Sequence, residues 1–139
     1  MTKQFWLNLP VKDLARSREF FAQLGFAFND KHGQTGMVSL IVGNGMVNLF
    51  PHAAFSGFAG AQVADTAGAA EVLLSLDAES RDEVDALAKK AKAAGAKVFG
   101  EPASVQGWMY GCGFADLDGH RWNVLHMDMS KMPGAEQAR

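Results

Sequence analysis

The sequence predicts an α+β fold in which two tandem β-α-β-β-β modules form a cupped mixed β-sheet with a central cleft. The main observation is that one order of strand-like and helix-like segments occurs twice in 139 residues. In each repeat the helix-like segment ends at a glycine, Gly25 in the first and Gly95 in the second. A chain of this length supports one structural domain made of two small halves.

The first module is expected to span residues 1–52. Pro10 predicts that the first strand lies at a sheet edge or contains a bulge, because proline cannot donate a ladder hydrogen bond. Asp13 is a suitable helix N-cap, and the following apolar residues, Leu14, Phe20, Phe21 and Leu24, lie on one helical face. The expected strands are 5–11, 26–29, 37–42 and 46–50, with turns at 30–34 and 43–45.

A linker rich in Ala and Gly is expected at 53–69, with a short helical turn near 53–58. The second module follows at 70–129, and residues 130–139 are expected to be a flexible tail. Ser80 and Glu83 have the spacing of a capping box at the start of the second helix. The expected strands of this module are 71–76, 97–100, 109–116 and 121–127.

Composition narrows the classes of partner and compartment. A net charge of −2 gives no reason to expect nucleic acid or an anionic membrane as a partner. The single cysteine, Cys112, cannot form an internal disulfide and fits a reducing compartment. No targeting sequence and no apolar run of membrane-spanning length is recognised, so a cytoplasmic location is expected.

Two motifs together resemble the vicinal oxygen chelate superfamily, which includes glyoxalase I, extradiol dioxygenases and bleomycin-resistance proteins. The first runs from Leu9-Pro10-Val11-Lys12-Asp13 through Ser17-Arg18-Glu19-Phe20-Phe21 to Leu24-Gly25-Phe26, and the second is Asp116-Leu117-Asp118-Gly119-His120. The resemblance covers about residues 4–128. It implies the cupped fold, a homodimer, and a divalent metal held by four inward-facing residues.

The residues at the four implied ligand positions are Trp6, Asn48, Glu71 and Asn123. Indole offers a metal no lone pair, amide oxygens are weak ligands, and one carboxylate cannot hold a transition metal. We therefore expect no metal and no cofactor at these positions. The histidines, His32, His52, His120 and His126, are expected to have structural roles.

The faces expected to line the cleft combine aromatic walls, amides and one acid, which suits a small organic ligand. The candidate ligand-binding residues are Trp6, Asn8, Asn48, Phe50, Glu71, Trp108, Tyr110 and Asn123. Two amides that face a cavity are either ligand contacts or a structural network, because a buried amide needs partners. The glycines at 107, 111 and 113 indicate either a backbone bent around a ligand or a bulge.

Three functions stay open at this point. The first is a metal-free protein that binds a small organic molecule, which the sequence favours. The second is a metal-dependent lyase or dioxygenase of the same superfamily. The third is a metal-independent enzyme in which Glu71 is the general base, which requires Glu71 to be desolvated by Trp6 and Met46 rather than solvated at a strand end.

Overall fold

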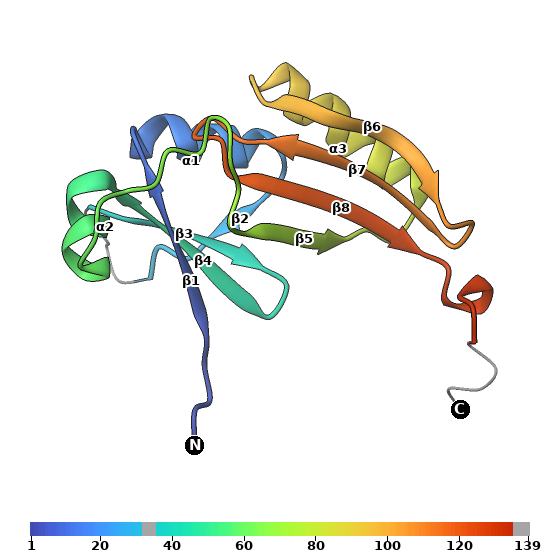
Figure 1. The fold of residues 1–139 in the computed structure, drawn as a ribbon, viewed down its shortest axis with the longest axis horizontal. Helices are drawn as coiled ribbons and strands as arrows, with labels where there is room; N and C mark the ends of the chain where they lie inside the picture. The colour runs from blue at the N-terminus through green and yellow to red at the C-terminus, as the bar shows by residue number, and fades with distance from the viewer. Residues whose placement is uncertain (32–35, 135–139) are drawn as a thin grey trace. The chain divides into compact units, whose positions relative to one another are not determined.

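The computed structural model describes residues 1–31 and 36–134, and these divide into two compact units, Met1–Ala67 and Gly68–Arg139 (Figure 1). The boundary lies in the segment that the sequence predicts as a linker. None of the helices in the described parts of the chain has the length and apolar character needed to cross a membrane.

Within its described residues, the first unit contains a four-stranded sheet of order β1-β4-β3-β2. β1 pairs in parallel with β4, and the other pairs are antiparallel. β1 is therefore an edge strand, as Pro10 predicts. The elements are β1 (Trp6–Val11), α1 (Leu14–Gln23), β2 (Ala27–Phe28), β3 (Val38–Val42), β4 (Gly45–Pro51) and α2 (His52–Ala59). The helix α2 extends the helical turn expected near 53–58.

The second unit has the same arrangement, with the described strands in the order β5-β8-β7-β6 and a parallel β5–β8 pair. Its elements are β5 (Leu73–Asp77), α3 (Arg81–Ala93), β6 (Lys97–Val105), β7 (Met109–Ala115), β8 (Arg121–Met127) and the 3₁₀ turn η1 (Met129–Lys131). The fold class is thus confirmed as α+β with two tandem modules. β5 begins two residues later than expected, so Glu71 lies before the strand.

The two main helices end in the same way, which explains the shared glycines. Gly25 and Gly95 have φ of 96° and 104°, which glycine adopts without steric cost. Each helix ends in a Schellman motif: Phe26 N–H donates to the carbonyl of Phe21, and Ala96 N–H donates to that of Ala91. These bonds satisfy backbone carbonyls that the helix leaves without partners.

Each sheet has one apolar face packed against its helix. In the second unit Val84, Ala88 and Ala91 of α3 are buried, and so are Trp122 and Val124 of β8. The residues that alternate with them along β8, Arg121, Asn123 and Leu125, are only partly buried. The strand therefore alternates as predicted. The face of the second sheet that lies opposite α3 and carries Arg121, Asn123 and Leu125 is called the helix-free face.

The turn before β8 is built around Asp116. Its carboxylate accepts hydrogen bonds from the backbone of Asp118 and His120 and from Trp122 Nε1, each at 3.0 Å. Burial raises the pKa of Asp116 above its usual value, against the opposing effects of the His120 charge and of these donors. Gly119 has a φ of 83°, as the Asp118-Gly119 turn signal predicts.

Candidate ligand-binding site

In the first unit, the predicted polar residues form a ladder across three strands. Asn48 is in register with Asn8 on one side and with Ser39 on the other. Its Oδ1 accepts a hydrogen bond of 2.7 Å from Ser39 Oγ, and its Nδ2 donates one of 3.1 Å to Asn8 Oδ1. Both ends of the Asn48 amide therefore have partners inside the sheet, which is the structural network that the sequence left open.

The two aromatic candidates of the first unit have different surroundings. Phe50 packs edge-on against Phe58 of α2, with ring centroids 5.3 Å apart. Trp6, at the start of β1, keeps 51% of its surface exposed. Trp6 is therefore not a core residue.

Asn123 occupies the position in the second sheet that Asn48 occupies in the first. It lies in the second strand of the sheet order, in register with Ser75 and Gly113. Gly113 has no side chain that could donate to it, and the Ser75 hydroxyl does not donate to its Oδ1. Among the described residues, Asn123 Oδ1 is buried and has no hydrogen-bond partner. A buried acceptor without a partner costs about 1–3 kcal/mol, which a structural amide would normally avoid.

The glycines of β7 fit the bulge interpretation. β6 carries one more residue than β7 between the pairs Val98–Phe114 and Gly100–Gly113, and that residue is Phe99. A Cβ on Gly113 would lie 2.5 Å from the Phe99 ring. The missing side chain at Gly113 thus leaves the space that the Phe99 ring occupies.

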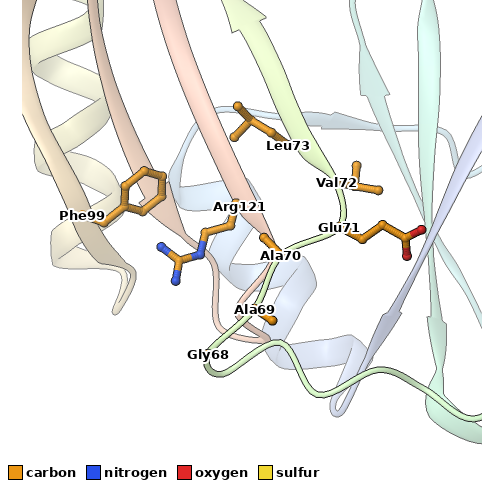
Figure 2. Close-up of a pocket in the computed structure, with 8 residues that line it drawn as sticks. All are labelled: Gly68, Ala69, Ala70, Glu71, Val72, Leu73, Phe99 and Arg121. Carbon is orange, nitrogen blue, oxygen red and sulfur yellow. The ribbon is translucent and has the colours of Figure 1, made fainter.

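A pocket of about 350 Å³ lies beside this bulge, entirely within the second unit. It is lined by Gly68, Ala69, Ala70, Glu71, Val72, Leu73, Phe99 and Arg121. The guanidinium carbon of Arg121 lies 4.7 Å from the centroid of the Phe99 ring. Figure 2 shows these two side chains on one side of the segment 68–73 and the Glu71 carboxylate on the other.

Glu71 is exposed and precedes β5. This is the solvated position that the sequence left open as the alternative to a general-base role. The catalytic role of Glu71 stays a prediction.

Trp108 and Tyr110 are not brought together with Asn123. Trp108 lies in the turn between β6 and β7 and donates from Nε1 to Gln106 Oε1 at 3.3 Å. Tyr110 lies on the α3 side of the sheet, where its hydroxyl donates to Asp85 Oδ1 at 2.6 Å. This bond raises the pKa of Tyr110, since it holds the proton beside a carboxylate.

The residues at the implied metal positions do not fit a divalent ion. Trp6 has no lone pair to offer, and both ends of the Asn48 amide are already hydrogen-bonded. Elsewhere in the described parts of the chain, no three His, Cys, Asp or Glu side chains gather as a possible metal site. His126 Nδ1 lies 3.0 Å from the carbonyl oxygen of Ala78, a structural contact. His52 begins α2, and His32 lies outside the described residues.

Phe99 and Arg121 are not among the candidate residues predicted from the sequence. Alternation along β8 places Arg121 on the same face as Asn123, so a charged group on this face is predictable from the sequence. Phe99 could not be found in this way, because the bulge interrupts the alternation of β6.

Comparison with known proteins supports the resemblance. The model of the Glyoxalase/Bleomycin resistance protein/Dioxygenase superfamily matches residues 3–124. A hypothetical protein from S. aureus is 36% identical, with a TM-score of 0.82 over 91% of this chain and 95% of that one.

More distant structures share the fold alone. A fosfomycin resistance protein from Listeria monocytogenes is 17% identical, with a TM-score of 0.66 over 91% of both chains. A lactoylglutathione lyase from Agrobacterium tumefaciens is 18% identical, with a TM-score of 0.66 over 95% of this chain and 98% of that one. No curated protein matches the sequence at a significant level. The chain belongs to the glyoxalase/bleomycin resistance protein/dioxygenase superfamily.

Proposed function

We propose that this protein binds a small organic molecule on the helix-free face of its second sheet, without a metal at the four implied positions. The observation that carries the proposal is the buried Asn123 Oδ1, which has no hydrogen-bond partner among the described residues. A ligand that donates to this oxygen would compensate for its burial. The homodimer and the cytoplasmic location expected from the sequence stay part of the proposal.

The contrast between the two modules strengthens this assignment. Asn48 and Asn123 hold the same place in their sheets. Asn48 is hydrogen-bonded to a hydroxyl and an amide, whereas the Asn123 oxygen has no partner in the described parts of the chain. The first module therefore uses its asparagine to join strands. In the second module the acceptor of the asparagine is buried without a partner among the described residues, so side chains around it must move for a ligand to reach it.

The neighbouring pocket limits the size and character of the ligand. Its volume of about 350 Å³ is near the lower end for small-molecule sites, which suits a molecule with about one ring. Leu73 and Phe99 line it and keep 55% and 47% of their surfaces exposed. A molecule with an apolar body would cover them and gain free energy from that burial.

The test is a titration of ¹⁵N-labelled protein with phenylacetamide, a neutral probe with one ring and an amide. We expect chemical-shift changes at Leu73, Gly113 and Arg121 and at the side-chain amide of Asn123. Asn123→Leu should weaken binding about 3- to 10-fold, the equivalent of one hydrogen bond. Asn44→Leu, a matched change in the exposed β3–β4 turn, should leave binding unchanged. If neither phenylacetamide nor phenylacetate shifts the helix-free face, the proposal is wrong.

The absence of a metal is tested separately by elemental analysis of protein purified without chelators. We expect Zn, Ni, Mn and Fe well below one equivalent per chain, because the donor set lacks imidazoles and has one carboxylate. A stoichiometric transition metal would overturn this part of the proposal and favour the metal-dependent lyase or dioxygenase.

A further inference from the structure

We propose that the ligand is an organic carboxylate whose anionic group pairs with Arg121. This rests on the proposed function, because it names the class of molecule that the same face binds. Arg121 lines the pocket, is partly buried, and lies against Phe99. No ion pair or hydrogen bond of its guanidinium is found among the described residues. Five N–H donors on one partly buried group are thus available to an anion.

A second arginine of the chain, Arg18, also lies over an aromatic ring, and its guanidinium has a carboxylate partner. The guanidinium of Arg18 lies 4.2 Å from the ring centroid of Phe28. Its edge binds the Asp30 carboxylate through two hydrogen bonds of 3.0 and 2.7 Å. The ring covers the face of the guanidinium, and the carboxylate binds at its edge, in the geometry that suits a planar fork of donors.

Arg121 lies over the Phe99 ring in the same way, but no carboxylate binds the edge of its guanidinium in the described residues. Among the residues that line the pocket, Glu71 carries the one carboxylate, and Figure 2 shows it directed away from Arg121. A bound carboxylate would take the part that Asp30 has beside Arg18. Its apolar body would then lie against Leu73, which is in register with Arg121 across the β5–β8 pair.

The experiment compares phenylacetate with phenylacetamide, which differ in the charge of one group and in the amide N–H that phenylacetate lacks for Asn123 Oδ1. Wild-type protein should still bind phenylacetate about tenfold more tightly, because charge-assisted hydrogen bonds to Arg121 are worth more than the one neutral hydrogen bond that is lost. Arg121→Gln should remove this preference and leave the affinity for phenylacetamide within about twofold. Arg121→Lys should recover part of it, since lysine keeps the charge and loses the planar fork.

Arg81→Gln is the matched control. Arg81 also lies over an aromatic ring, that of Tyr110, but on the opposite face of the same sheet. It should leave both affinities unchanged, and the amide spectrum of each variant reports whether it is folded. Equal binding of the two probes by the wild type, or a preference that survives Arg121→Gln, would overturn the carboxylate assignment while binding to this face stands. Absence of binding by both probes would overturn the proposed function itself.

Discussion

The Phe99 ring occupies the space that a side chain at Gly113 would need, since a Cβ there would lie 2.5 Å from ring carbon Cε1. The ring also supports the Arg121 guanidinium at 4.7 Å. One glycine and one bulge therefore position the aromatic wall and the cation of the candidate site. The physical cause is steric, because Gly113 is not among the residues with positive φ.

We expect Gly113→Ala to displace the Phe99 ring at a small cost in stability, below about 1 kcal/mol, since an exposed side chain can move. Gly111→Ala should cost more, about 1–3 kcal/mol, because its Cβ would lie 2.7 Å from the backbone carbonyl of Val124. Urea unfolding followed by tryptophan fluorescence measures both. Adding Phe99→Ala should restore the stability lost in Gly113→Ala, because the ring that the new Cβ meets is gone. Adding Leu125→Ala should not restore the stability lost in Gly111→Ala, because the Val124 carbonyl stays in place. Equal costs for the two glycine variants would contradict this account.

The two equivalent asparagines should respond in opposite ways to replacement by leucine. Asn48→Leu removes the acceptor for Ser39 Oγ and the donor to Asn8, so we expect a loss of about 1–3 kcal/mol. Asn123→Leu removes a buried oxygen that has no partner among the described residues, so stability should be unchanged or higher. Thermal unfolding of the ligand-free variants measures both changes in stability. A large loss for Asn123→Leu would show that this amide is structural.

Asp116 should be essential to the turn before β8. Asp116→Ala leaves the buried Trp122 Nε1 without its 3.0 Å acceptor, at an expected cost of at least about 1.5–3 kcal/mol. Asp77→Ala, which removes an exposed carboxylate at the end of β5, is the matched control. Chemical denaturation measures both, and a cost no larger than that of the control would rule out this role.

The same carboxyl predicts a pH dependence. Its pKa is raised in the folded protein, mainly by burial, so the folded state binds its proton more tightly than the unfolded state does. Its contribution to stability is therefore fully present below the unfolded pKa and is lost as pH rises through the raised, folded value. The stability of wild type relative to Asp116→Asn should fall over that window. If the stability of wild type relative to Asp116→Asn rose with pH instead, the hydrogen-bond donors would outweigh burial in setting the pKa of Asp116.

Tyr110 is the only tyrosine in the sequence, so its titration can be followed directly by ultraviolet absorbance. We expect its pKa above the ordinary value of about 10, because its hydroxyl donates to Asp85. Asp85→Ala should lower the pKa towards that value. Asp82→Ala, a carboxylate in the first turn of the same helix, should change it less. An unchanged pKa in Asp85→Ala would contradict the hydrogen bond.

Elements whose causes lie within a few residues of one another were predictable from the amino-acid order alone. The helix N-caps, the glycines that end the helices and the Asp118-Gly119 turn depend on residues within a few positions of one another, and the structure contains each of them. The faces of β4 and β8 followed from simple alternation along a strand.

Only the tertiary structure separated Asn48 from Asn123, because the difference lies in the strands beside them. Ser39 stands next to Asn48 and Gly113 next to Asn123, and neither pairing can be read without the register. The bulge in β6 likewise brought Phe99 to Arg121 across the sheet, where no pattern of spacing in one strand could place it. The candidate site thus depends on contacts between distant parts of the chain, while the helix ends and turns depend on local ones.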